Sequence, residues 1–299
     1  MYFLGKWGEK DIFSGTTLEI LHCETSKITN MSQAFSFSVQ MKYWNETIAV
    51  AQRILTELRR RRRSLIFWVI FPIAILLLNG TIFAERAKEN LTFQQAFERA
   101  APATLVGAAL FFSCLGGSVA TVVSEREQRT LKRLFLSPLS GTSYFLGICL
   151  AHLAIALGQT VLIGVVAAFM GARFHGSPIL GGLIILLSIL SYVGVGFVLG
   201  TQFARRTEDV NALIAAFGVP LLILGGAFVP AFIFPKVLRD LAQFNPVYHM
   251  NEALTLVTAE GKSFSEIAVH FWFLVGFAIA MVIAGWLSYR RMLRVERQL

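Results

Sequence analysis

Long apolar runs alternate with short polar stretches through most of this chain. Six such runs follow residue 63, and each is about 20 residues long or longer. A helix of about 20 apolar residues can cross the roughly 30 Å hydrocarbon core of a bilayer. The pattern therefore predicts an all-α membrane protein with six transmembrane helices, at residues 64–83, 102–124, 141–170, 178–203, 212–235 and 267–289.

The segment before the first run, "YWNETIAVAQRILTELRRRRRS", has an amphipathic pattern. Its apolar side chains recur at helical spacing, while Glu46, Arg53 and Glu57 fall on the opposite face. A helix of this kind that ends in arginines is typical of one lying on the inner membrane leaflet, although a soluble amphipathic helix is the alternative. The predicted residues of this interfacial helix are Trp44, Ile48, Ile54, Leu58, Arg59, Arg60, Arg61, Arg62 and Arg63.

The first 40 residues are mixed and polar, with no sustained period. We expect residues 1–40 to form an N-terminal extension that is either disordered or the result of a misassigned start. Met31 and Met41 are the alternative start positions. Residues 41–299 then form the transmembrane domain.

The composition agrees with a membrane protein, because 55% of the residues are hydrophobic and 15% are charged, against about 25% charged in soluble domains. A net charge of +9 could indicate nucleic acid as a partner. However, the Lys and Arg residues lie mostly beside the ends of the apolar runs, where they set orientation and meet anionic lipid. The ends on the side of Arg59–Arg63 carry about twice as many of them as the opposite ends. We therefore expect a plasma (inner) membrane protein with both termini in the cytoplasm, with membrane lipid and no nucleic acid as a partner.

Few polar side chains fall inside the six runs. None holds Asp, Glu, Lys or Arg away from its ends, which argues against an ion-relay mechanism because such relays use intramembrane carboxylates. His152 and Gln159 lie on one face of the third run, and His270 lies in the sixth. Each predicts a hydrogen bond between helices, with contact to a transported substrate as the alternative.

Glycine and proline predict close helix packing and broken helices. Gly196 and Gly200 form a G-x-x-x-G pair, which lets two helices approach closely. Prolines in the fifth run remove backbone donors and kink or end a helix. Residues 237–244 predict a short amphipathic helix at the outer interface. The candidate pathway or packing residues are His152, Gln159, Gly196, Gly200, Pro220, Gly225, Gly226 and Pro230.

No catalytic motif is present. The chain has no complete phosphate-binding loop, no H-E-x-x-H zinc motif and no G-x-S-x-G elbow. A membrane-embedded lipid-modifying enzyme would need His, Asp, Glu or Cys residues clustered near one interface, and the sequence gives no such cluster. We therefore predict no catalytic residue, no metal site and no cofactor bound by this chain.

The polar stretch between the second and third runs, "SEREQRTLKRLFLSPLSG", is longer than a simple connection requires. Ser124 could act as a helix N-cap with Glu125 and Glu127 in the first turn, and Pro138 would end the helix. Leu131 and Leu134 would give it an apolar face. The pattern favours a helix that contacts a cytoplasmic partner, and a solvated or lipid-lying loop is the alternative.

The residues from Glu125 to Ser140, in the pattern E-R-E-x-x-T-L-x-R-L-x-x-S-P-L-S, resemble a stretch in the membrane subunits of ABC exporters of the type-two permease family. The resemblance extends to the amphipathic helix before the first span, to the six-span layout, to "GGAFVP" at Gly225–Pro230 and to "NPVYHMNEAL" at Asn245–Leu254, and it covers about residues 41–299. Arg129 departs from the pattern, because relatives often have glycine there.

This resemblance implies a permease subunit of an ATP-driven exporter, in which ATP and magnesium would bind a separate P-loop ATPase and not this chain. It also implies a second permease copy or related permease as a dimer partner, a bacterial membrane, and a hydrophobic or amphiphilic substrate such as a drug, a lipid or a lipid-linked glycan. Secondary transport driven by an ion gradient, or less directly lipid modification, are the alternatives. The residues implied in a coupling helix against the ATPase are Glu125, Arg126, Glu127, Arg129, Thr130, Leu131, Arg133, Leu134, Phe135 and Pro138.

Overall fold

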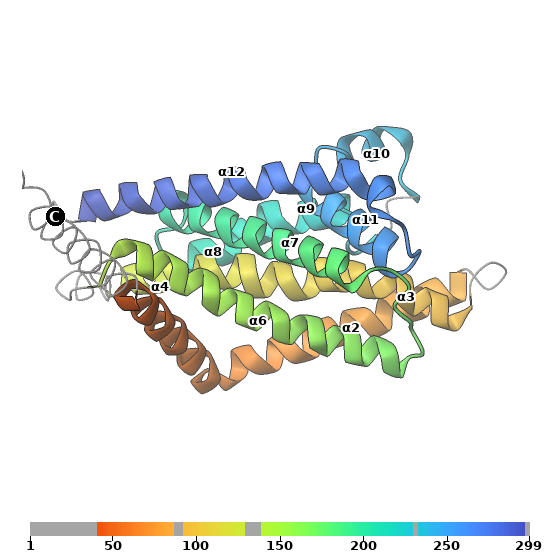
Figure 1. Cartoon of the computed structure of the whole chain (residues 1–299), viewed down its shortest axis with the longest axis horizontal. Helices are drawn as coiled ribbons and strands as arrows, with labels where there is room; N and C mark the ends of the chain where they lie inside the picture. The colour runs from red at the N-terminus through yellow and green to blue at the C-terminus, as the bar shows by residue number, and fades with distance from the viewer. Residues whose placement is uncertain (1–40, 87–91, 129–138, 230–232, 297–299) are drawn as a thin grey trace, which may run out of the picture. The chain divides into compact units, whose positions relative to one another are not determined.

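The computed structural model describes residues 41–86, 92–128, 139–229 and 233–296, and the regular structure within these ranges is helical (Figure 1). The chain divides into two compact units, Met1–Asn45 and Glu46–Leu299. The second unit is the one described below. The predicted extension over residues 1–40 and the candidate residue Pro230 lie outside the described residues.

Six helical segments are long and apolar enough to cross a membrane, as the sequence predicts. A separate helix over residues 41–60 precedes them. The spans are built from α2 (Arg62–Arg86); α3 (Phe93–Thr104), η1 (Leu105–Gly116) and α4 (Gly117–Glu127); α6 (Gly141–Phe169); α7 (Pro178–Val198) and η2 (Leu199–Phe203); α8 (Thr207–Leu213), η3 (Ile214–Gly218) and α9 (Val219–Leu224); and α12 (Phe264–Glu296). Here η marks a π-helical turn or segment.

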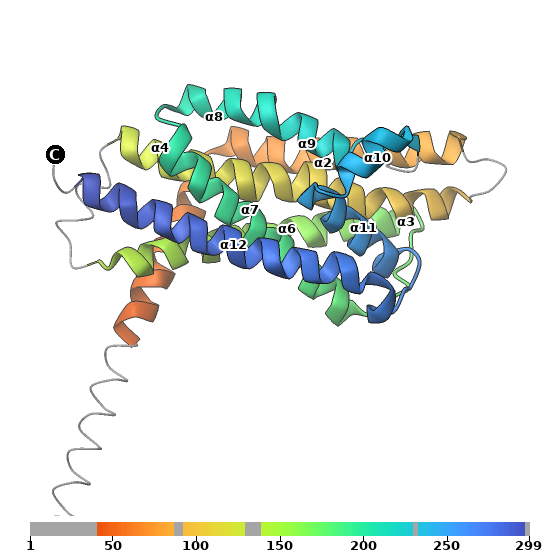
Figure 2. The same cartoon turned by 90° about the horizontal axis from the view of Figure 1, so that it is seen from above.

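The second span is the central helix of the bundle. Of the most apolar residues of this span, 83% are buried inside the protein, against 17–50% in each of the other five spans. Figures 1 and 2 show its three segments running along the bundle, with α2, α6 and α7 in contact with it. The polar stretch after residue 124 therefore follows directly on the most buried of the six spans.

The second span begins earlier than the sequence indicates, at Phe93 rather than Pro102. Thr92 starts it through a capping box, in which its Oγ1 accepts a hydrogen bond from the Gln95 backbone and the Gln95 side chain accepts one from the Thr92 backbone. The polar residues of this first part hid its helical start. One of them, Glu98, is 7% exposed and lies within the first two turns of the helix, so the span carries a buried carboxylate near its start, in a part that the predicted bounds leave out.

The same span also ends later than predicted. Ser124 lies inside α4, and the Gln128 backbone donates a hydrogen bond to its carbonyl at 2.9 Å. The prediction that Ser124 caps a separate helix is therefore wrong: the spanning helix itself continues to Glu127. Residues 129–138, most of the predicted coupling helix, lie outside the described residues.

Glycines bring the fourth span against its neighbours, and Gly196 and Gly200 are two of them. A side chain at Gly196 would collide with Ser118 Oγ, and one at Gly200 would lie 3.2 Å from Val122 Cβ, so α7 and η2 pack directly on α4. On the other side, Gly194 faces the Met281 backbone of α12 in the same close manner. Small residues thus permit backbone contact on two faces of one span.

The fifth span is shorter than predicted, because it ends at Leu224 instead of Pro235. Gly225 and Gly226 form a turn there, with Gly226 at a φ of 79° that glycine adopts without strain. The predicted outer helix is present as α10 (Lys236–Ala242). A second one, α11 (Pro246–Thr258), was not predicted, and its Asn251 side chain donates to the Gly226 carbonyl at 3.0 Å. The two sequence motifs "GGAFVP" and "NPVYHMNEAL" therefore contact each other.

Candidate functional site: the polar cluster at the end of the second span

The helix over residues 41–60 packs on the third span through its middle. Its buried side chains are Thr47, Val50, Ala51 and Ile54. A side chain at Gly147 of α6 would lie 2.6 Å from Val50 Cβ, so glycine is what allows this approach. Of the residues predicted for the interfacial helix, Ile54 lies in the contact and Trp44 is exposed. Arg62 and Arg63 belong to α2 rather than to this helix.

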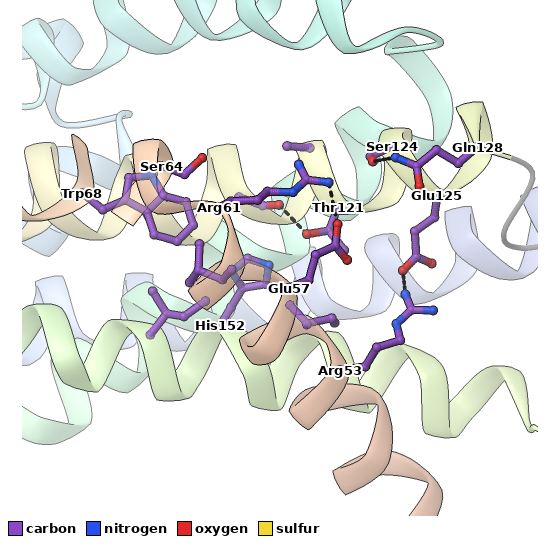
Figure 3. A pocket seen from close by; sticks show the side chains of 15 residues that line it. Arg53, Glu57, Arg61, Ser64, Trp68, Thr121, Ser124, Glu125, Gln128 and His152 are labelled. Atoms are coloured by element: carbon purple, nitrogen blue, oxygen red, sulfur yellow. Dashed lines mark hydrogen bonds and ion pairs between the residues drawn. The ribbon is translucent and has the colours of Figure 1, made fainter. Parts of the chain in front are cut away.

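Glu125, in the last turn of α4, is 6% exposed and joins three elements. It forms an ion pair with Arg53 of the preceding helix, and the Tyr144 hydroxyl of α6 donates a hydrogen bond to its carboxylate. Figure 3 shows the pair of Arg53 and Glu125. Glu125 is the buried member of this pair, and the Arg53 side chain is 38% exposed, so loss of Arg53 would leave the Glu125 charge buried without compensation. Glu125 therefore fixes the helix over residues 46–60 to the end of the central span.

The next two residues reach two further elements. The Arg126 guanidinium donates to the backbone carbonyls of Gly200 and Ala204, at 3.2 and 3.3 Å. Glu127 accepts a hydrogen bond of 2.6 Å from the Thr207 hydroxyl at the start of α8. Three consecutive residues thus contact the preceding helix, the end of the fourth span and the start of the fifth.

Ser140, which follows the 129–138 segment, is held by hydrogen bonds in a similar way. The Ser140 backbone donates a hydrogen bond of 3.2 Å to Glu46 Oε2, and its hydroxyl accepts one of 3.0 Å from the Ser143 backbone. Ser140 is thereby the N-cap of α6. Both flanks of the segment are tied to the helix over residues 41–60, one through Glu125 and Arg53 and the other through Ser140 and Glu46. Any displacement of the segment would act on that helix from two points.

A cavity of about 260 Å³ opens beside this cluster (Figure 3). In that view His152 and Trp68 lie toward one end of it, and Arg53 and Glu125 lie toward the other. Apolar side chains from three helices complete its wall, among them Ile54 and Ile155. The cavity is therefore part apolar and part charged.

The polar residues inside the predicted spans form hydrogen bonds to neighbouring helices. His152 Nδ1 lies 3.0 Å from the Ser113 carbonyl of η1, and the Gln159 side chain donates to the Trp68 carbonyl of α2 at 2.9 Å. His270 Nδ1 lies 2.9 Å from Nδ1 of His249 on α11. Burial lowers the pKa of His249, which keeps this ring neutral and able to share that hydrogen bond.

The sequence predicts the residues of the cluster but not their partners. Arg53 looks like a solvent-facing charge on an amphipathic helix, and Tyr144 looks like an ordinary interfacial aromatic residue. The one feature of the sequence that could have indicated these contacts is Glu125, a glutamate directly after an apolar run, where burial is expected. Among the described residues, no group of three or more His, Cys, Asp or Glu side chains is placed to hold a metal ion.

The other predicted coupling residues are Arg129, Thr130, Leu131, Arg133, Leu134, Phe135 and Pro138, and they lie outside the described residues. Their contact with an ATPase stays a prediction. Glu125 is buried inside the helix bundle, so we expect it to act on a partner through the position of the segment it precedes.

Comparison with known proteins shows which family the chain resembles. A family model described as "ABC-2 type transporter" matches residues 45–258. The chain is 24% identical over 239 residues to a putative transport permease, ycf38, of Porphyra purpurea, with 78% of this chain and 81% of the relative covered. It is 25% identical to the putative transport permease YvfS of Bacillus subtilis, with 75% and 89% covered. It is also 25% identical to the probable multidrug ABC transporter permease YbhR of Escherichia coli, with 57% of this chain but only 46% of that relative covered.

Proposed function

Since this chain belongs to the ABC-2 type transporter family, we propose that it is the membrane subunit of an ATP-driven exporter whose energy comes from a separate P-loop ATPase. ATP and magnesium would bind that ATPase and not this chain. The related permeases named for multidrug transport and for linearmycin resistance support an outward direction and a hydrophobic or amphiphilic substrate. A second permease copy or a related chain would complete the pathway.

One observation carries the coupling part of the proposal: three consecutive residues at the end of the central span each contact a different element. Glu125 reaches Arg53, Arg126 reaches η2, and Glu127 reaches α8. A push on the segment that follows them would be shared at once among the preceding helix and the fourth and fifth spans. This is the arrangement that a membrane subunit needs if its energy arrives from outside the membrane.

The segment from Arg129 to Pro138 would supply the contact with the ATPase. Leu131, Leu134 and Phe135 give it apolar side chains, and Arg129 and Arg133 give it charge. An apolar patch with charges around it is the usual composition of a protein–protein contact. In the proposed orientation this segment, the Arg59–Arg63 run and both termini face the cytoplasm.

The test is a pull-down of the tagged chain from its native membranes in mild detergent, with identification of the proteins that accompany it. We expect a P-loop ATPase to co-purify with the wild-type chain and to be lost from Leu134→Asp. Val295→Asp is the matched control, because it adds the same charge at an exposed apolar position near the end of α12 and should retain the ATPase.

The two parts of the proposal fail in different ways. If no ATPase accompanies the wild-type chain under conditions that preserve other membrane complexes, ATP-driven export is the wrong function for it. If the ATPase remains bound to Leu134→Asp as well as it does to the wild-type chain, the function stands and the assignment of the docking segment is wrong.

A further inference from the structure

Two histidines, His249 and His270, meet where α11 packs on α12. Their Nδ1 atoms lie 2.9 Å apart. His249 Nε2 lies 2.8 Å from the Gln243 carbonyl, which can only accept a hydrogen bond, so this nitrogen carries a hydrogen. Burial lowers the pKa of His249, so the ring is neutral and its Nδ1 keeps a lone pair. The hydrogen between the two rings therefore belongs to His270.

This arrangement limits the number of protons that the pair can hold. The His270 ring is partly exposed, and it can take up a hydrogen on Nε2 while the contact between the Nδ1 atoms stays the same. A further proton on His249 would set one N–H against another across 2.9 Å, and both would lose their acceptor. The pair can thus carry one positive charge with the contact intact, and two charges only when the rings separate.

The His249 ring cannot turn away from this conflict without a further loss. It is 5% exposed and stacks on Phe273 at a centroid distance of 3.8 Å and an interplanar angle of 15°. A flip of the ring would bring a carbon atom, in place of Nε2, toward the Gln243 carbonyl and remove that hydrogen bond. A second positive charge therefore breaks the contact between α11 and α12 at this point.

The charged groups around the pair do not neutralise a second charge. In the part of the chain that the structure describes, neither imidazole forms an ion pair with a carboxylate. Glu266, one turn before His270 on α12, is held by Lys262 at 2.8 Å. α7, which packs on both helices, contains no charged residue. The charged or titratable groups that the other neighbouring elements bring to this end of the bundle include Glu98, Arg99, Arg239, Tyr248 and Glu252.

α11 also supports the end of the fifth span. Asn245, the N-cap of α11, donates a hydrogen bond of 2.7 Å to the Leu221 carbonyl of α9. Asn251 donates one of 3.0 Å to the Gly226 carbonyl, in the turn that follows α9. Movement of α11 away from α12 would therefore change the support of this turn and of the fifth span.

We propose that His249 and His270 form an acid-sensitive latch between α11 and α12. The latch is closed while the pair carries no more than one positive charge, and it opens when acid on this side of the membrane adds a second. Opening releases the end of the fifth span from α12. In the exporter proposed above this is the outer side, where substrate leaves, and only that last point rests on the proposed function.

The test is hydrogen–deuterium exchange of the full chain in lipid nanodiscs, measured by mass spectrometry on the α11 peptide Pro246–Thr258. The pH runs from about 7.5 to about 5, which spans the ordinary histidine pKa of about 6.5. Intrinsic exchange rates also change with pH, so each variant is compared with the wild type at the same pH.

Two variants separate the latch from other histidine titrations. In His270→Gln the side-chain amide can turn either its oxygen or its nitrogen toward His249, so the contact survives in both protonation states. His175→Gln is the matched control, because it removes another histidine of this end of the bundle whose ring pairs with Glu98 instead.

We expect exchange of α11 in the wild type, relative to His270→Gln, to rise about ten-fold for each pH unit below about 6.5. The open state binds one proton more than the closed state, so acid favours opening. Above that pH the ratio should be constant. His175→Gln should follow the wild type over the whole range.

A ratio between wild type and His270→Gln that does not change with pH would overturn the proposal. A rise that His175→Gln abolishes as fully as His270→Gln does would overturn it too. If His270→Gln does not insert, wild-type exchange that is independent of pH after correction for the intrinsic rates has the same consequence. The experiment contains no ATPase and no transport step, so its failure leaves the proposed function standing, and the absence of an ATPase partner leaves the latch standing.

Discussion

Two buried carboxylates stand near opposite ends of the second span, and they are held by different kinds of partner. Glu98, near the start of α3, accepts hydrogen bonds of 2.9 Å from Gln94 and 3.0 Å from the Arg173 backbone, and it lies 3.2 Å from His175 Nε2. Glu125, at the end of α4, holds Arg53 and Tyr144. Both are about equally buried, at 7% and 6% exposure, so burial does not distinguish them.

The difference lies in what each partner is attached to. Gln94 belongs to the same helix as Glu98, and Arg173 and His175 belong to the short connection between α6 and α7. The neighbouring Arg99 makes a further bond of 3.2 Å to Glu260, beyond the end of α11. These contacts join spans to the connections between spans. Glu125 instead joins the central span to a helix that precedes all six spans. It also lies beside the segment that we propose binds another protein. One end therefore ties spans to the connections between them, and the other ties the central span to the helix over residues 41–60, as the proposed coupling requires.

The largest effect should separate the two carboxylates directly. Glu125→Ala leaves the Tyr144 hydroxyl buried without its partner and releases Arg53, which is 38% exposed and can turn toward water. We expect a loss of about 3 kcal/mol at most in the free energy of unfolding, together with loss of ATP-driven activity in the complex with the ATPase. Glu98→Ala is the matched control, with a loss of about 1–2 kcal/mol and retained activity. Thermal unfolding and ATP turnover of the purified complexes measure both, and an inactive Glu98→Ala protein would erase the distinction.

A smaller effect is expected from the middle of the same span. Gly196→Ala would push a methyl group into Ser118 Oγ of α4, which should cost about 1–3 kcal/mol of unfolding free energy because overpacking forces the two helices apart. Gly182→Ala on the same helix is the control, since no atom lies within 4 Å of the added group. Ser118→Ala combined with Gly196→Ala should recover part of the loss in thermal unfolding. Equal unfolding temperatures for the two glycine variants would show that close packing on the central span is not needed.

The smallest effect should separate the contributions of the two contacts of Glu125, the ion pair with Arg53 and the hydrogen bond from Tyr144. Tyr144→Phe removes only the hydroxyl that donates to Glu125, and we expect a loss of about 1 kcal/mol in unfolding free energy. The ion pair with Arg53 remains, so ATP turnover should stay near that of the wild-type complex. A Tyr144→Phe protein as inactive as Glu125→Ala would mean that α6, rather than the helix over residues 46–60, receives the displacement.

Much of this fold could be predicted from the sequence. Apolar length determines where six spans lie, and the spacing of apolar residues identifies the helix before them. The ends of the spans were harder to predict. Glu98, for example, is a charged residue type that is nevertheless buried near the start of the second span. Its partners Arg173 and His175 come from a distant connection that gives no periodic signal. The α11 helix was missed for a related reason: its buried residues include His249 and Asn251, which hide an apolar face.

The candidate site was predicted in part. Glu125, Arg126 and Glu127 were identified by their place in a motif, but the motif does not say whether a side chain faces a partner or the protein's own interior. Arg53 was placed on the polar face of its helix, and only the structure pairs it with Glu125. Charge pairing between segments far apart in the chain depends on three-dimensional register, which local patterns do not contain.

The most direct test of the account is a charge exchange between Arg53 and Glu125. Arg53→Glu and Glu125→Arg would be made singly and together, and ATP turnover of the complex that co-purifies with each tagged chain would be measured. Each single change places two like charges in contact, so we expect turnover to fall to a small fraction of the wild-type rate. The double variant restores an opposite pair and should regain a substantial part of that rate. A double variant no more active than the worse single one, or single variants as active as the wild type, would contradict the claim that this pair transmits displacement from the segment to the helix over residues 46–60.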